Sequence, residues 1–479
     1  MELNKTFIDG LWSKEINVSD FVSKNITSYT GDASFLQGPT ERTKHIWNLC
    51  LKALEEERAN NGVRSLDHTT VSTITSHKAG YIDKENELIV GLQTDELLRR
   101  AIKPFGGINV VAKACRENGV EVDDKVKDIF THYRKTHNDG VFDVYTEEIR
   151  SFRSLGFLTG LPDNYARGRI IGDYRRLALY GIDRLIEAKQ EDLRHLTGPM
   201  TEARIRLREE VAEQIKALKD IKTMGEYYGL DLSHPATSAQ EAVQWVYMAY
   251  LAAVKEQDGA AMSLGNVSSF LDIFIEYDLA HGKIDETFAQ ELIDQFIIKL
   301  RMVRHLRMQS YNDIFAGDPT WVTEAIGGRF NDGRVKVTKT SFRFLQTLYN
   351  LGPSPEPNMT VLWSPELPEG FKEFCAKVSV DTSSIQYEND NLMREVRNCD
   401  DYGIACCVSY QAIGKQIQFF GARANLAKAL LLAINGGRCE NTGTVMVKGI
   451  PVLTHDTLNF EEVMNNYKKV LTEIARVYN

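Results

Sequence analysis

The feature that most constrains the fold is an alternation of helical and strand-like segments. Residues 203–225 place Ile, Leu and Val at three- and four-residue intervals, which is typical of an amphipathic helix. Similar spacing predicts helices over 40–58, 90–103, 239–256, 287–307 and 459–478. Short runs rich in β-branched or aromatic residues predict strands over 359–363, 376–380, 402–407 and 444–447. Helices that alternate with short strands indicate an α/β fold.

Composition narrows the classes of protein. The formal charge of −9 argues against nucleic acid or an anionic membrane as the main partner. The first residues lack a basic start followed by an apolar core, and no apolar run approaches the length of a membrane span. Seven cysteines without framework spacing fit a reducing compartment. We therefore expect a cytoplasmic protein.

Cys406 and Cys407 are adjacent, at the end of a short apolar run. Neighbouring Cα atoms lie ~3.8 Å apart, below the ~4.4–6.8 Å span of ordinary disulfides, so a bridge between them would be strained. Metal sites usually separate their thiolates by two to four residues, and no partner pair exists in the sequence. The pair therefore fits either two inert core cysteines or a site that passes a reaction from one sulfur to the other.

Several other stretches accompany the cysteine pair. One of them, residues 414–428, reads Gly-Lys-Gln-Ile-Gln-Phe-Phe-Gly-Ala-Arg-Ala-Asn-Leu-Ala-Lys. Together with the pair it resembles the pyruvate formate-lyase family of glycyl radical enzymes, also called formate C-acetyltransferases. The resemblance is collinear from near residue 5 to residue 479, and the doubled cysteine is the mark of the lyase branch. Further stretches that carry it are 75–81, 158–162, 167–175, 259–263 and 352–358.

The resemblance implies a specific architecture. Residues 1–160 are expected to form a mainly helical N-terminal region. Residues 161–479 are expected to form the first part of the glycyl-radical-enzyme α/β barrel, including the cysteine loop. The chain would thus be a single domain of the lyase type that holds about half of the barrel. An incomplete barrel leaves an unpaired strand edge, so a partner chain is expected to complete it.

The family carries its radical on a glycine in a motif like Arg-Val-Ser-Gly-Tyr-Ala-Val, and the sequence contains no such string. We therefore expect a split enzyme, in which a glycyl-radical-domain protein supplies the radical in trans. A radical-SAM activating enzyme would install that radical, and a dimer or heterotetramer would form. Two alternatives stay open: a non-catalytic scaffold or regulatory remnant of a lyase, and a truncated product of a full-length 2-keto acid formate-lyase.

The resemblance also implies roles for the cysteines. Cys407 matches the residue that gives a hydrogen atom to the glycyl radical, and Cys406 matches the residue whose thiyl adds to pyruvate. The acetyl group left on Cys406 would pass to coenzyme A, the co-substrate. No cofactor and no metal are expected to be bound by the chain itself.

Substrate-binding residues follow from the same resemblance. Arg169 and Arg423 match the arginines that hold the carboxylate of pyruvate, a task suited to a planar two-pronged donor. Other residues matching the pocket lining are Trp321, Phe420, Ala260 and Ala261.

The sequence departs from the family after the cysteines. The family usually continues Pro-Met-Ile-Val, whereas this chain reads Tyr-Gln-Ala-Ile over 410–413. Because proline fixes φ, its loss predicts a looser cysteine loop. This change leaves open whether pyruvate or 2-oxobutyrate is preferred.

Overall fold

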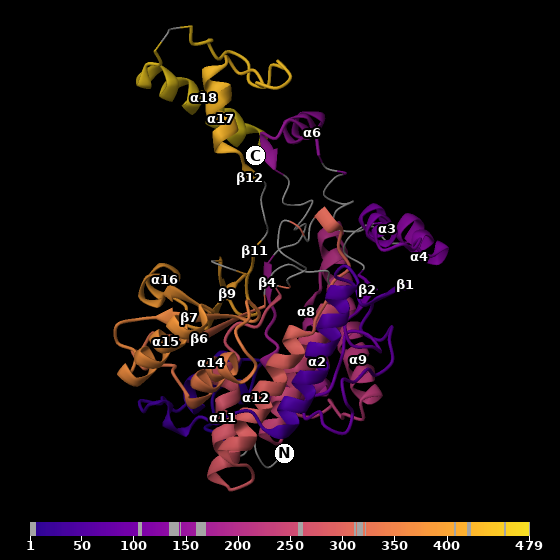
Figure 1. The fold of residues 1–479 in the computed structure, drawn as a ribbon, viewed down its shortest axis with the longest axis vertical. Coiled ribbons are helices and arrows are strands. Elements are labelled where there is room, and N and C mark those ends of the chain that lie inside the picture. The colour runs from indigo at the N-terminus through magenta and orange to yellow at the C-terminus, as the bar shows by residue number, and fades with distance from the viewer. Residues whose placement is uncertain are drawn as a thin grey trace. The chain divides into compact units, whose positions relative to one another are not determined.

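The computed structural model divides the chain into two compact units (Figure 1). Unit 1 comprises Met1–Thr131 and Arg169–Gln418, and unit 2 comprises His132–Gly168 and Phe419–Asn479. The residues described are 6–103, 108–133, 143, 145–159, 169–256, 262–310, 313, 320, 322–406, 409–418, 423–454 and 457–478, of which 159, 169–170, 417–418, 423 and 478 are described by backbone only.

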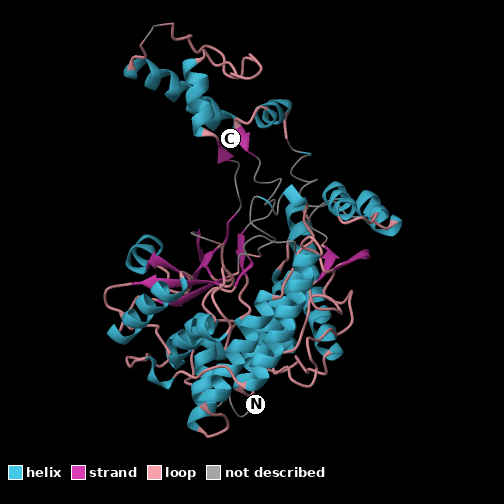
Figure 2. Cartoon of the chain, viewed as in Figure 1, coloured by secondary structure: helices cyan, strands magenta, loops and turns pink. Residues whose placement is uncertain are grey.

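Unit 1 is rich in helices (Figure 2). Its helices are η2 (Leu11–Ser13), α1 (Val18–Asn25), η3 (Ala33–Phe35), α2 (Glu41–Ala59), α3 (Ile108–Glu117), α4 (Asp124–Asp128), η4 (Ile129–Tyr133, at the unit boundary), α8 (Arg175–His195), α9 (Glu202–Tyr227), α10 (Ala239–Glu256), α11 (Ser268–Ala280), α12 (Glu286–Arg301), α14 (Lys339–Asn350), α15 (Glu369–Thr382) and α16 (Asp390–Arg397). Its strands are β1 (Ser65–Val71), β2 (Arg99–Ile102), β4 (Arg169–Ile171), β5 (Met262–Ser263), β6 (Thr323–Gly327), β7 (Asn358–Trp363), β8 (Ile385–Asn389), β9 (Tyr402–Ala405), β10 (Ser409–Ala412) and β11 (Ile417–Gln418).

Unit 2 is small and has its own core. Its elements are α6 (Glu147–Ser154), β3 (Leu158–Thr159), β12 (Arg423–Ala424), α17 (Leu426–Ile434) and α18 (Phe460–Tyr478). Ala429 and Leu432 of α17 pack in one cluster with Val470 and Ile474 of α18. None of the helices in the described part of the chain is long and apolar enough to cross a membrane.

The main core of unit 1 lies between helices. α10 buries consecutive residues such as Trp245, Val246 and Tyr247, which point to different faces, as expected for a helix surrounded by others. α11 adds Phe270 and Phe274, whose ring centroids lie 5.3 Å apart. One cluster joins these side chains with those of α12 and α14, so the helical layer forms a single support for the sheet.

The sheet of unit 1 has parallel strands at its centre. β6, β7 and β8 pair in parallel, in sequence order. β4 and β5 also pair in parallel, with β11 antiparallel to β4. Backbone hydrogen bonds connect the two groups: Leu264 N–H donates to Thr323 O (2.8 Å) and Ala325 N–H donates to Gly265 O (2.6 Å). The order along this surface is therefore β11, β4, β5, β6, β7 and β8.

Successive residues of each strand face opposite sides of the sheet. Ile326 of β6 and Val361 of β7 belong to the helical core cluster. Their neighbours Ala325 and Leu362 instead pack against Ile404 of β9. Helices thus cover one face of the sheet, and the β9–β10 hairpin covers part of the other.

Most of the long helices predicted from periodicity are confirmed. α2, α9, α10 and α18 match their predicted ranges closely, and α12 ends at Arg301, before its predicted end at residue 307. The predicted strands over 359–363 and 402–407 are β7 and β9, although β9 ends at Ala405.

Three predictions are wrong. Residues 90–103 are not a helix, because Gly91 and Leu98 adopt positive φ and Arg99–Ile102 pairs with β1. Residues 376–380 lie in α15, whose buried residues Phe371, Phe374, Cys375 and Val378 follow helical spacing. Residues 444–447 form one isolated bridge, between Val445 and Arg438, in place of a strand. The predicted domain boundary between 160 and 161 lies outside the described residues and stays a prediction.

A buried arginine connects the helical layer to the hairpin. Arg175, at the start of α8, donates to both carboxylate oxygens of Asp401 at 2.9 Å and to Asp173 Oδ1 at 2.7 Å. Although burial opposes its charge, the two carboxylates hold the pKa of the guanidinium above its ordinary value. Asp401 directly precedes β9, so this ion pair fixes the point where the hairpin begins.

We predict that Arg175→Met lowers the free energy of unfolding by about 3–5 kcal/mol, because it leaves the largely buried Asp401 carboxylate without its guanidinium and removes one of the two arginines beside Asp173. Urea unfolding followed by tryptophan fluorescence measures the change. The matched control is Arg194→Met, since Arg194 pairs with Glu191 at the surface, where solvent screening leaves such a pair little effect on stability. Equal effects of the two substitutions would contradict the prediction.

Candidate active site

Cys406 lies at the tip of the β9–β10 hairpin. The strands are antiparallel, with Ala405 opposite Ser409, so residues 406–408 connect them. Cys406 is buried, with 6% of its surface exposed. Its φ of 64° lies in the left-handed region, which costs a residue with a side chain about 1–2 kcal/mol. Cys407 and residue 408 lie outside the described residues.

Three side chains from successive strands hold the backbone of Cys406. Its N–H donates to Ser263 Oγ of β5 at 3.1 Å. Its carbonyl oxygen accepts from Thr323 Oγ1 of β6 at 2.6 Å and from Asn358 Nδ2 of β7 at 3.5 Å. These contacts compensate the unfavourable φ, because tertiary hydrogen bonds can maintain a residue in a sparsely populated conformation.

The hairpin approaches the sheet closely through a glycine contact. A Cβ added to Gly403 would lie 2.7 Å from Gly265 Cα, so a side chain has no room there. On either side, Ile404 packs with Ala325 and Leu362, and Ala405 packs with Ile171 and Ile413. The backbone contact therefore fixes the distance between the hairpin and the sheet. The apolar contacts fix the register of the hairpin.

Tyr410 contributes to the hairpin. The absence of proline at this position predicted a looser loop, but Tyr410 lies in β10 and its ring stacks on Tyr402 with centroids 4.7 Å apart. Tyr402 Oη donates to Asp390 Oδ1 at 2.8 Å, and burial followed by the nearby Asp390 carboxylate raises the pKa of this phenol. The loop residues 407 and 408 lie outside the described residues, so the expected loosening stays a prediction.

Glu324 is a buried carboxyl group beside this site. It follows Thr323 in β6 and faces the opposite side of the sheet, where its Oε1 accepts from Ser268 N–H, at the start of α11, at 2.8 Å. Burial raises the pKa of Glu324 to about 8. We expect the carboxyl to be largely protonated at neutral pH.

The structure places few of the predicted substrate residues. Arg169 lies in β4, two residues before Ile171, which pairs with Ser263. Its backbone is thus near the strand that holds Cys406, and its side chain is not described. Arg423 lies in β12 of unit 2, where its backbone pairs with Thr159. The remaining predicted residues lie outside the described residues: Cys407, Ala260, Ala261, Trp321 and Phe420.

Sequence reasoning did not identify Ser263, Thr323 and Asn358. Two of them lay in stretches that the resemblance had highlighted, since 259–263 ends at Ser263 and 352–358 ends at Asn358. A small polar residue at the first or last position of a buried strand is the available signal. It becomes informative only when the order of strands in the sheet is known.

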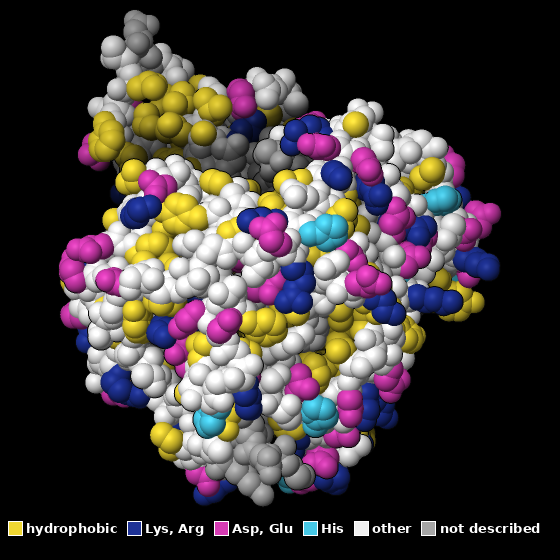
Figure 3. All heavy atoms as spheres, turned by 60° about the horizontal axis from the view of Figure 1, so that its bottom comes forward, with side chains coloured by type: hydrophobic (Ala, Val, Ile, Leu, Met, Phe, Trp, Pro, Cys, Tyr) yellow, Lys and Arg dark blue, Asp and Glu magenta, His cyan; other side chains and the backbone are white. Residues whose placement is uncertain are grey.

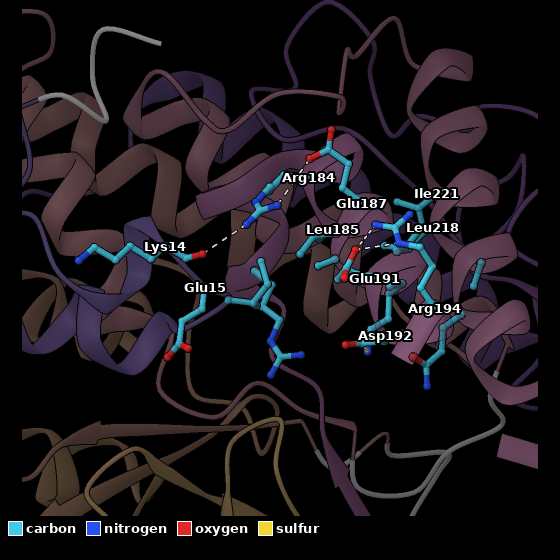
Figure 4. Close-up of a pocket in the computed structure, with 16 residues that line it drawn as sticks. Lys14, Glu15, Arg184, Leu185, Glu187, Glu191, Asp192, Arg194, Leu218 and Ile221 are labelled. Atoms are coloured by element: carbon cyan, nitrogen blue, oxygen red, sulfur yellow. Dashed lines mark hydrogen bonds and ion pairs between the residues drawn. The ribbon is translucent and has the colours of Figure 1, made fainter. Parts of the chain in front are cut away.

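A cavity of about 790 Å³ lies elsewhere in unit 1, between α8, α9 and the segment around Lys14 (Figure 4). Its floor is apolar, with Leu185, Leu218 and Ile221. Its charged side chains pair largely with one another, and none of the predicted site residues lines it. It therefore does not offer a second candidate active site. The pairs are Arg184–Glu187, Lys189–Asp192 and Arg194–Glu191.

Two general features of the molecule concern metal binding and surface charge. In the described ranges, no group of three or more His, Cys, Asp or Glu side chains is arranged to hold a metal ion. On the face shown in Figure 3, acidic and basic side chains are interspersed.

Comparison with known proteins gives the context of this site. The family described as "Pyruvate formate lyase-like" matches residues 11–479. The chain is 56% identical to the formate acetyltransferase of Haemophilus influenzae over 479 residues. That match covers 98% of this chain and 62% of the relative, so the chain spans less than two thirds of the relative's length.

Solved structures share the fold. The B12-independent glycerol dehydratase of Clostridium butyricum has a TM-score of 0.74 at 20% identity, covering 92% of this chain and 63% of that one. A glycyl radical enzyme of Archaeoglobus fulgidus has a TM-score of 0.66 at 17% identity, covering 96% and 63%. At these identities the likeness concerns the fold alone, and it confirms the predicted α/β class.

We predict that Thr323→Val lowers the free energy of unfolding by about 1–3 kcal/mol, because it leaves the buried Cys406 carbonyl without its shortest hydrogen bond. Chemical denaturation measures the loss. Thr360→Val is the matched control: Thr360 lies opposite Ala325 in β7, and its buried hydroxyl has no hydrogen-bond partner. A loss as large for Thr360→Val would show that the Cys406 contact is not the cause.

We predict that Glu324→Gln changes how stability depends on pH. The ordinary pKa of the carboxyl is 4.5, and in the folded chain it is about 8, so between these values the folded state holds a proton that the unfolded state releases. Stability therefore falls as pH rises through this window, by up to about 1.4 kcal/mol per pH unit. Denaturation midpoints from pH 5 to pH 8 should fall less steeply for the variant, and parallel profiles would contradict the assignment.

Proposed function

Because the chain belongs to the pyruvate formate lyase-like family, we propose that its Cys406–Cys407 pair carries out the thiyl chemistry of a formate acetyltransferase. The substrates are pyruvate and coenzyme A, and the products are acetyl-CoA and formate. The 56% identity to a formate acetyltransferase supports this activity over that of the more distant dehydratases.

The observation that carries the proposal is the placement of Cys406. Cys406 is buried at a hairpin tip, and side chains of β5, β6 and β7 hold its backbone. A radical on sulfur needs a site that excludes water and competing reactants, and it needs a fixed position relative to the bond that breaks. Two inert core cysteines would not require a left-handed residue held by three tertiary hydrogen bonds.

The proposed reaction proceeds through the two cysteines in turn. Cys407 gives its thiol hydrogen to the glycyl radical, and Cys406 then gives its own hydrogen to the Cys407 thiyl. The Cys406 sulfur adds to the keto carbon of pyruvate, and the bond from that carbon to the carboxyl carbon breaks. The one-carbon radical fragment takes the hydrogen atom held by the Cys407 thiol to become formate, and the radical returns to Cys407. Cys406 is left acetylated, so that covalent catalysis divides one difficult cleavage into two steps.

Coenzyme A receives the acetyl group through its thiol. We propose that Arg169 and Arg423 hold the carboxylate of pyruvate, since a guanidinium can pair with both of its oxygens. Lining residues of the pocket are proposed to be Trp321, Phe420, Ala260 and Ala261. The same pocket could select 2-oxobutyrate by accommodating one more methylene group, and the assay below compares the two acids.

The radical glycine is proposed to lie on a segment outside the 479 residues, since they contain no motif like Arg-Val-Ser-Gly-Tyr-Ala-Val. Our specific hypothesis is the split arrangement: a glycyl-radical-domain protein completes the barrel, and a radical-SAM enzyme installs the radical on it. The assembly would be a dimer or a heterotetramer in the cytoplasm. Among the described strands β8 pairs on one side only, with β7, and this supports the hypothesis because an unpaired edge is a template for a further strand.

An anaerobic reconstitution tests the proposed function. The chain is mixed with a separately produced glycyl-radical-domain protein and the activating enzyme. The radical signal is then recorded together with formate release from pyruvate or 2-oxobutyrate plus coenzyme A. Radical formation with release of formate supports the split lyase. Radical formation without release from either acid, in a complex shown to have assembled, would favour a scaffold role.

We predict that Cys406→Ser and Cys407→Ser each abolish formate release while the radical signal still forms, because serine cannot sustain the hydrogen-atom relay. The control is Cys399→Ser, which changes a half-buried thiol that precedes the hairpin and donates to Asp401 O. Serine can keep this hydrogen bond and both relay sulfurs remain, so turnover should stay within about twofold. Turnover in either hairpin variant would exclude the relay.

A further inference from the structure

A second thiol site lies in unit 2, apart from the cysteine hairpin. Lys428 is in the first turn of α17 (Figure 1), where its N–H donates to the Asn425 side chain. Cys439 follows α17 in a tight loop: its N–H donates to Thr444 O at 2.9 Å and its carbonyl accepts from Gly443 N–H at 2.8 Å. The helix and the loop therefore hold both side chains on rigid backbone.

The amine and the thiol are in direct contact. Lys428 Nζ lies 3.0 Å from Cys439 Sγ and 2.7 Å from Glu440 Oε2. Lys428 is 5% exposed and Cys439 is 2% exposed, whereas the Glu440 side chain is 31% exposed. The pair is thus largely covered by protein, and the carboxylate that contacts Lys428 is partly exposed to solvent.

The surroundings favour the thiolate form of Cys439. Hydrogen bonding from Thr442, followed by the Lys428 ammonium, lowers the pKa of this thiol from 9 to about 7. Burial instead raises the pKa of Cys50 to about 12 and raises that of Cys375 further. Since the thiolate is the reactive nucleophile, Cys439 differs chemically from these other buried thiols.

From this geometry we propose that Lys428 and Cys439 form a modification site for hydroperoxides, at which oxidation joins the two side chains through a sulfur–nitrogen bond. The site consists of two reactive groups already in contact, and its chemistry does not depend on the proposed lyase activity. The oxidant class is a small hydroperoxide such as hydrogen peroxide.

Two balanced steps give the bond. The Cys439 thiolate attacks one oxygen of hydrogen peroxide, so that an S–O bond forms, the O–O bond breaks and hydroxide leaves; sulfur is oxidised to a sulfenic acid. Loss of the thiolate removes one of the two anions beside Lys428, and Glu440 Oε2 remains 2.7 Å from its amine. The hydroxide released in the first step takes a proton from the ammonium and becomes water. The free amine then attacks sulfur, the S–N bond forms, the S–O bond breaks and water leaves.

The product would connect α17 to the loop at 438–445 within unit 2. Because a thiol can reduce the sulfenamide back to a free amine and a free thiol, the connection is reversible. It would therefore record exposure to peroxide at a site separate from Cys406.

Peptide mapping of the peroxide-treated chain tests the proposal. The 479-residue chain is treated with hydrogen peroxide, digested without reductant and analysed by mass spectrometry. We expect a peptide pair joined at Lys428 and Cys439 that has lost two hydrogen atoms and separates on treatment with a thiol. Cys439 should react about tenfold or more faster than Cys50 and Cys375, because they hold little thiolate.

Two controls separate the geometry from general reactivity. Lys428→Arg keeps a cation beside the thiol but removes the primary amine, so Cys439 should still oxidise without a cross-link. Denaturing the wild-type chain in urea before adding peroxide should abolish the cross-link, and this control requires no variant to fold. Oxidised Cys439 with free Lys428 in the folded wild-type chain, or no preference for Cys439 over Cys50 and Cys375, would overturn the proposal.

Discussion

The cysteine hairpin depends on the ion pair between Arg175 and Asp401. A guanidinium with little access to water donates two parallel hydrogen bonds to Asp401 and a third to Asp173. A buried ion pair need not raise the net stability of the fold. Removal of either partner is nevertheless costly, because it leaves an uncompensated charge. The helical layer thereby determines where β9 starts, and the position of the cysteines four residues later follows from it.

The remaining contacts of the hairpin come from both the backbone and the side chains. The close approach of Gly403 to Gly265 sets the distance from the sheet. Apolar side chains of alternate residues set the register. Ser263, Thr323 and Asn358 then select the left-handed conformation of Cys406. Each contact alone is modest, and together they specify the position of one residue at the tip.

The sequence allowed prediction where pattern and tertiary structure agree. The stripe over 203–225 forms one apolar face of α9, and the apolar run over 359–363 forms a strand that is buried on both faces, so both elements are present. The strand predicted over 376–380 was wrong because the prediction relied on the β propensity of Val378 and Val380. Phe371 and Phe374 upstream complete a helical face with Val378. The helix predicted over 90–103 was wrong because local sequence pattern does not reveal a positive φ or a strand partner that is distant in the sequence.

The site could be predicted in part for a similar reason. Cys406 was identified because two adjacent thiols are chemically unusual, and the resemblance to a family assigned them a role. Thr323 and Asn358 could not be identified, since a hydroxyl and an amide are common residues whose value here comes from neighbouring strands. The roles of the substrate residues stay predictions, because the side chains of Arg169 and Arg423 are not described.

The contacts of Cys406 also imply an order of events during synthesis. Ser263, Thr323 and Asn358 precede it by 143, 83 and 48 residues, and Arg175 precedes Asp401 by 226. Since a chain leaves the ribosome from its N-terminus, Arg175 and the three side chains that bond the backbone of Cys406 have emerged before the cysteines do. Docking of the hairpin can therefore complete a preformed scaffold during translation, without waiting for these anchors to be made.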